Sequence, residues 1–153
     1  MPSPFLFHPL AVHLALSLGL FSALAEILPP FMKRLSPRFR KRTLTLTLLF
    51  LSLALLTGFL SLSTIQERHI SLPPTASIHE VAALSGGSLF LLLWFLGEKR
   101  SKKHPKALSP RQVIAGVGLF ALLVAATLGG HLVYEDRLGT SYMLPHSSSR
   151  LPH

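Results

Sequence analysis

Four long apolar stretches alternate with short polar segments along the chain. They cover about residues 9–31, 43–65, 76–97 and 112–134. Each reaches the roughly 20 residues that an α-helix needs to cross the hydrocarbon core of a bilayer. The pattern predicts an all-α membrane protein, an antiparallel bundle of four transmembrane helices that forms one domain over residues 1–153. Residues 136–153 are expected to form a polar tail, and no internal repeat is evident.

The composition favours a membrane protein over a soluble one. Charged residues make up 14% of the chain and the mean hydropathy is +0.49, whereas soluble domains carry about 25% charged residues. Cysteine is absent. This excludes disulfide scaffolds, thiolate zinc sites, cysteine-held iron–sulfur clusters and c-type haem attached through cysteine.

Basic residues gather in two of the segments between the apolar stretches. Of the 15 Lys and Arg residues, twelve lie in these two segments: Lys33, Arg34, Arg38, Arg40, Lys41, Arg42, Lys99, Arg100, Lys102, Lys103, Lys106 and Arg111. The positive-inside rule places loops 32–42 and 98–111 in the cytoplasm and both termini outside, and we expect the membrane to be a bacterial inner (plasma) membrane. These short loops offer no element that reads nucleic acid, so we expect contact with membrane lipids and no nucleic-acid partner.

Histidines are concentrated near the outer ends of the expected spans. His13, His79 and His131 lie at a similar shallow depth when helix rise is counted, and His8 just precedes the first span. Neutral imidazole ligates haem iron, copper, zinc and iron(II). We therefore expect axial ligands of a b-type haem among these residues, with His79 pairing with His131 or His13 and His8 in reserve. A site for a transition metal formed by His13, His79 and His131 is the other form that this hypothesis takes. Separate interfacial or hydrogen-bonding roles are the equal alternative.

One carboxylate and several glycines also lie within the expected spans. Glu26 is near the cytoplasmic end of the first span, and we expect it to pair with Lys33 or Arg34 rather than to transfer protons or ions. Gly86 and Gly129 share helices with His79 and His131. Small residues of this kind ordinarily serve helix packing in membranes, and a groove for a flat ligand is the alternative.

Three segments carry a resemblance to a known family. They are His8-Pro9-Leu10-Ala11-Val12-His13, His79, and Gly129-Gly130-His131-Leu132-Val133-Tyr134. Over about residues 8–140 the chain resembles the membrane proteins grouped as domain of unknown function 2231. The resemblance implies four membrane helices. It also implies a redox association, because relatives sometimes occur with Rieske-type or cytochrome modules.

The leading hypothesis is a membrane subunit that binds b-type haem and transfers electrons at the outer face. A site near one face does not carry electrons across the roughly 30 Å core, so a redox partner is implied. A cofactor-free structural or assembly subunit of a membrane complex is the alternative. A small transporter is a third, although the spans lack the central charge pair and broken helix that transporters often show. We expect no independent catalytic activity.

Overall fold

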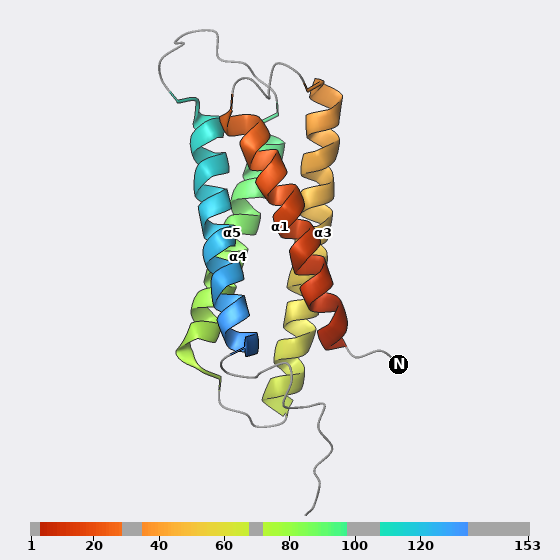
Figure 1. Cartoon of the computed structure of the whole chain (residues 1–153), viewed down its shortest axis with the longest axis vertical. Helices are drawn as coiled ribbons and strands as arrows, with labels where there is room; N and C mark the ends of the chain where they lie inside the picture. Colours follow the sequence, from red (N-terminus) through yellow and green to blue (C-terminus); the bar gives the residue numbers. More distant parts are fainter. Residues whose placement is uncertain (1–3, 29–34, 68–71, 98–107, 135–153) are drawn as a thin grey trace, which may run out of the picture.

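Four long helices account for most of the chain. The computed structural model describes residues 4–28, 35–67, 72–97 and 108–134. The helices are α1 (Pro4–Ile27), α3 (Pro37–Glu67), α4 (Pro74–Phe95) and α5 (Pro110–Tyr134), packed as a bundle (Figure 1). All four are long and apolar enough to cross a membrane. The predicted all-helical bundle of four apolar helices is confirmed.

Prolines determine where the helices begin and end. Each helix starts at a proline, whose fixed φ suits the first helical position. Helix α1 ends at Ile27, before the expected boundary at residue 31, because Pro29 disfavours a helical conformation at the residue that precedes it. Helices α3 and α5 begin earlier than the expected spans, so Arg38–Arg42 and Arg111 belong to first helical turns and not to loops.

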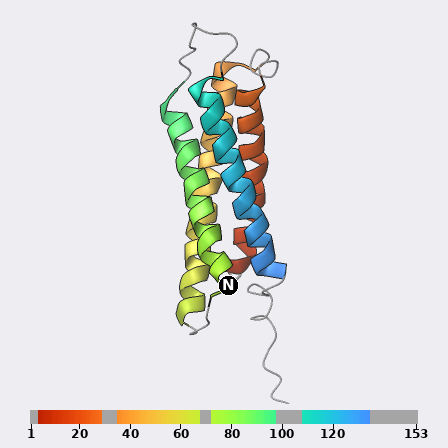
Figure 2. The ribbon, with the colours of Figure 1, turned by 90° about the vertical axis from the view of Figure 1, so that its left-hand side faces the viewer.

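The helices are arranged as a ring in which each one packs against two neighbours. Helix α1 packs against α3 and α5, and α4 packs against the same two helices from the other side (Figures 1 and 2). Helices α1 and α4 begin at one end of the bundle, where α3 and α5 finish. We call this the histidine end, because it holds His8 and His79, and the opposite end, which holds Arg40 and Arg111, the arginine end.

Ile65 and Leu132 are buried at the histidine end, and further large buried side chains fill the middle of the bundle and its arginine half. The latter are Leu44, Leu51, Phe90, Leu93 and Leu122, of which Phe90 and Leu93 are at most 1% exposed. Counted by helix rise from the alanines whose carbonyls His8 and His79 bind, Leu51 and Leu122 lie about one turn away, and Leu44 lies about 15 Å away. Four alanines are also buried on the core side of the two imidazoles: Ala11, Ala15, Ala54 and Ala125.

Candidate functional site: a histidine pair between two helical hairpins

His8 attaches the start of α1 to α3. Its Nδ1 donates a hydrogen bond to the Ala54 carbonyl oxygen at 3.0 Å and lies 3.0 Å from Thr57 Oγ1. The ring packs on Gly58, where an added Cβ would lie 3.1 Å from the imidazole Cε1. A glycine at this position therefore lets the imidazole approach the α3 backbone closely.

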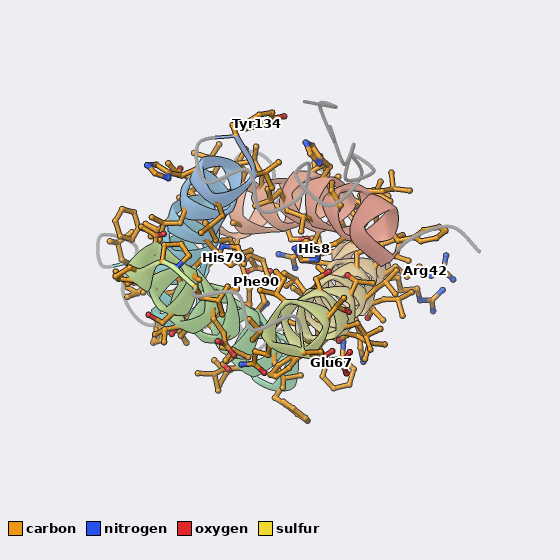
Figure 3. All side chains as sticks on the ribbon, turned by 90° about the horizontal axis from the view of Figure 1, so that it is seen from below. His8, Arg42, Glu67, His79, Phe90 and Tyr134 are labelled. Atoms are coloured by element: carbon orange, nitrogen blue, oxygen red, sulfur yellow. The ribbon has the colours of Figure 1, made fainter. Side chains whose placement is uncertain are left out.

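His79 makes the corresponding contact between α4 and α5. Its Nδ1 donates to the Ala125 carbonyl oxygen at 2.7 Å. An added Cβ at Gly129 would lie 2.9 Å from its Cε1. Both imidazoles are half-buried and point from their helices into the interior of the bundle (Figure 3).

These two contacts are copies of one another, separated by 71 residues. In both, the histidine and the carbonyl it binds are 46 residues apart in the chain. The pairs related by the 71-residue spacing are His8–His79, Ala54–Ala125, Gly58–Gly129, Leu51–Leu122 and Arg40–Arg111. The bundle is therefore two equivalent units, a first hairpin (α1 and α3) and a second hairpin (α4 and α5). The expectation of no internal repeat was wrong. Few residues are identical in the two halves, and their shared contacts make the repeat plain.

Hydrogen bonding determines which ring nitrogen remains able to bind a ligand. A carbonyl oxygen only accepts, so Nδ1 of His8 and of His79 carries the proton and the lone pair of each neutral ring is on Nε2. Within the described ranges, no hydrogen bond engages either Nε2. Histidines that ligate metals commonly donate their second ring N–H to a carbonyl in this way.

The structure does not bring His13 and His131 to this pair. Both are exposed on the outside of the bundle, and His13 Nδ1 donates to the Pro9 carbonyl of its own helix at 2.6 Å. His13 follows His8 by five residues, a turn of about 140° around α1, and His131 follows Gly129 by about 200° around α5. The similar positions of His13, His79 and His131 along their helices therefore do not bring the three side chains together. Among the residues that the structure describes, no three His, Asp or Glu side chains are placed to hold a metal ion.

The importance of His8 was underestimated because the first span was expected to begin at residue 9. Helix α1 begins at Pro4, so His8 lies inside the helix. Its 71-residue separation from His79 was the signal in the sequence that could have identified the pair. His69, His104, His146 and His153 lie outside the described residues.

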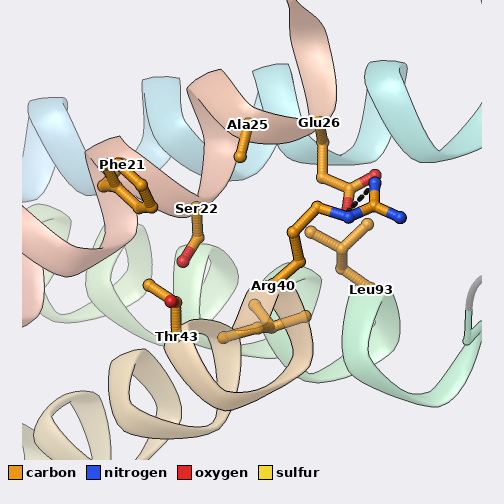
Figure 4. A pocket seen from close by; sticks show the side chains of 8 residues that line it. Phe21, Ser22, Ala25, Glu26, Arg40, Thr43 and Leu93 are labelled. Atoms are coloured by element: carbon orange, nitrogen blue, oxygen red, sulfur yellow. Dashed lines mark ion pairs between the residues drawn. The ribbon is translucent and has the colours of Figure 1, made fainter. Parts of the chain in front are cut away.

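A buried ion pair characterises the arginine end. Glu26 is 4% exposed, and its carboxylate accepts two hydrogen bonds from Arg111, at 2.8 Å from Nη2 and 3.1 Å from Nε. Arg40 Nη1 lies 4.0 Å from the same carboxylate (Figure 4). Two arginines related by the repeat thus converge on one acid. The expected partners Lys33 and Arg34 lie outside the described residues.

Further hydrogen bonds join the helices around this ion pair. Arg111 also donates to the carbonyl oxygens of Leu93 and Gly97 at the end of α4. Trp94 Nε1 donates to Thr45 Oγ1 at 3.0 Å. The side chain of Trp94 therefore connects α4 to α3.

The fold and these sites define a class of protein: an integral membrane protein of four helices, built from two equivalent hairpins, with a histidine pair in its interior. The chain belongs to the family of predicted membrane proteins called DUF2231, which matches residues 4–142. This confirms the resemblance carried by the histidine and glycine motifs. No curated protein and no solved structure matches the chain.

Proposed function

We propose that the protein is a membrane electron-transfer subunit that binds a b-type haem through His8 and His79. The observation that carries the proposal is the pair of interior imidazoles, each with Nδ1 bound to a carbonyl of its own hairpin. That arrangement presents two Nε2 lone pairs from opposite hairpins. Two imidazoles on facing helices are a common axial ligand set for haem in helical bundles, and the bound iron would carry one electron.

The surroundings of the rings support a flat apolar ligand. Ala11, Ala54 and Ala125 are buried next to the two imidazoles on the side of the core. Phe90 follows His79 by eleven residues, so it lies about 16 Å along the bundle. Small side chains near the imidazoles and a large one deeper in the bundle suit a ligand that lies at the histidine end.

The exposed basic residues support an orientation of the protein in the membrane, and that orientation implies a redox partner. Arg38, Lys41 and Arg42 are exposed on the first turns of α3 at the arginine end, which supports placing that end at the cytoplasmic face of the bacterial inner membrane, among anionic lipid headgroups. The histidine pair then lies near the outer face, together with both chain termini. A single haem there does not span the roughly 30 Å core, so electrons would pass to or from a redox protein with its own cofactor.

An absorbance spectrum of the purified protein tests the proposal. Protein from haem-supplied cells, in mild detergent, should show a Soret band and, after dithionite reduction, sharp α and β bands. His8→Ala and His79→Ala should each abolish the sharp reduced bands. His13→Ala and His131→Ala, on the exposed side of the same helices, are matched controls and should leave the spectrum unchanged. A visible spectrum without bands, or equal loss in all four variants, would refute a His8–His79 haem.

A cofactor-free structural or assembly subunit is the second candidate. The favouring observation is that each imidazole already makes a hydrogen bond and fits a glycine within its own hairpin. In that case His8→Ala and His79→Ala would destabilise a colourless protein. Metal analysis of the same preparation separates a colourless transition-metal site from a subunit without any bound group.

A further inference from the structure

An apolar groove runs along the outside of the first hairpin, beside His8. It lies between α1 and α3 and has a volume of about 280 Å³, close to the lower end of the range of roughly 300–1,000 Å³ for small-molecule sites. None of the residues that line it is charged: Phe7, Leu10, Ala11, Leu14, Phe50, Leu53, Thr57 and Leu60.

The groove opens to the hydrocarbon phase of the membrane. All the residues that line it belong to the two spans of the first hairpin, which are long and apolar enough to cross a bilayer. Its walls are exposed side chains such as Phe7 and Leu10, which are 50% and 58% exposed. Ala11 and Thr57 are buried and form its floor. An occupant therefore reaches the groove through the membrane and not from water, so it is a lipid-soluble molecule.

Thr57 connects the floor of the groove to His8. Its Oγ1 lies 3.0 Å from His8 Nδ1 and donates its hydrogen to a carbonyl oxygen of its own helix. A hydroxyl oxygen has two acceptor lone pairs, so Thr57 can accept a bond from a further O–H group while it faces His8. A ligand held on this floor lies one side chain away from the imidazole.

The second hairpin does not repeat these features. At the 71-residue spacing, Leu128 stands in place of Thr57 and Ala121 in place of Phe50. The groove of the first hairpin thus combines a buried hydroxyl and an aromatic wall that the equivalent positions of the second hairpin lack. This combination suits a flat ring that carries polar substituents.

We propose that the groove binds a membrane-soluble quinone, with the quinone ring next to Thr57 and the isoprenoid tail along the apolar walls. A quinone supplies the flat ring, the hydrogen-bonding oxygens and the apolar tail, whereas a phospholipid headgroup would find no charged side chain here. The role of the site rests on the proposed function, but the binding does not. Oxidation of a quinol in the groove would release two electrons, which pass singly by way of iron held by His8 to the redox protein, and two protons, which pass to water at the outer face.

Tryptophan reporters at positions related by the repeat test the binding. Trp94 is the one tryptophan of the chain, so a Trp94→Phe background leaves the reporter as the sole source of tryptophan fluorescence, which quinones quench at short range. Leu10→Trp places the reporter on the wall of the groove. Val81→Trp places it at the equivalent position of the second hairpin, where the side chain is 63% exposed. Decylubiquinone is then titrated into liposomes that hold each variant.

Quenching of the Leu10→Trp reporter should saturate, and at low quinone it should be at least twice that of the Val81→Trp reporter. The latter should rise only in proportion to the quinone in the membrane. Thr57→Leu, which introduces the residue of the second hairpin, should remove the saturable part, and Thr57→Ser, which keeps the hydroxyl, should retain it. Equal and proportional quenching at both reporters would overturn the proposal. Stronger quenching of the Leu10→Trp reporter by phospholipids with brominated acyl chains, without a saturable effect of quinone, would also overturn it and assign the groove to an acyl chain.

The absorbance spectra of the same samples separate this site from the proposed function. Saturable quenching in protein that shows no haem bands supports the quinone site and refutes the haem. Haem bands together with proportional quenching at both reporters support the haem and refute the quinone site.

Discussion

The two hairpins share a shape but differ in the polarity of their interiors. The first hairpin buries five polar or charged residues: Ser22, Glu26, Thr43, Thr47 and Thr57. The residues that occupy the equivalent positions of the second hairpin, 71 residues later, are apolar or glycine: Leu93, Gly97, Ile114, Gly118 and Leu128. The histidine, the alanine whose carbonyl it binds and the glycine on which it packs are the same in both.

This difference shows which residues the shape of a hairpin requires and which are an addition in the first hairpin alone. Each imidazole packs directly on the backbone of α3 or α5, which requires a residue without a side chain at that point. Glycine meets this requirement in both hairpins. The polar residues are not required for that shape, since the second hairpin lacks them. In the first hairpin they make specific contacts, such as the 3.1 Å hydrogen bond between Ser22 and Thr47 and the ion pair of Glu26.

Among positions related by the repeat, alanine substitutions of Arg111 and Arg40 should differ most in how much they lower the free energy of unfolding. Arg111→Ala removes two charged hydrogen bonds and leaves the buried carboxylate of Glu26 without its closest partner. Breaking a buried ion pair from one side costs about 3–5 kcal/mol. Arg40→Ala removes a 4.0 Å contact and should cost less. Thermal unfolding in detergent, followed by the fluorescence of Trp94, measures both losses.

Arg38→Ala is the control for these variants, because Arg38 is exposed near the same end of α3. Its unfolding temperature should match that of the unmodified protein. Equal destabilisation by the Arg40 and Arg111 variants would show that Glu26 is not held more strongly by Arg111 than by Arg40.

Substitutions of Gly58 and Gly129 test the feature that the two hairpins share, the packing of an imidazole on a glycine. An alanine at Gly129 would place its Cβ 2.9 Å from His79, and one at Gly58 would do so 3.1 Å from His8. Overpacking of this kind costs about 1–3 kcal/mol, and the Gly129 variant should lose more. Gly130→Ala is the matched control, because a Cβ there meets no atom within 4 Å, and alanine favours a helix by about 1 kcal/mol.

Chemical denaturation of the three glycine variants gives the order of stability. The expected order is Gly130→Ala above the unmodified protein, then Gly58→Ala, then Gly129→Ala. A Gly129→Ala protein as stable as the Gly130→Ala protein would mean that His79 does not pack on α5 as described.

Hydropathy was sufficient to predict the four helices, because each one must be apolar over its full length to cross a bilayer. It did not predict which histidines meet. The position of a residue along a helix follows from the helix rise, but the direction of its side chain depends on how the helix is rotated about its axis in the bundle. His13 and His131 are exposed on the sides of their helices that face away from the bundle interior. The partners of Glu26 also depend on packing, since Arg111 is 85 residues away in the chain.

Thr57 should have the smallest effect, because it is a polar addition to a contact that the second hairpin makes without it. Thr57 Oγ1 lies 3.0 Å from His8 Nδ1, while the equivalent Leu128 makes no such bond and His79 relies on the Ala125 carbonyl at 2.7 Å. Thr57→Val should therefore cost about 0.5–1.5 kcal/mol, as for one hydrogen bond, and leave any haem spectrum in place. Thr127→Val, which removes an exposed hydroxyl bonded to its own helix, should cost less in the same denaturation experiment. Loss of the haem bands in Thr57→Val alone would mean that the hydroxyl, and not the Ala54 carbonyl, orients His8, so the two histidine contacts would not be equivalent.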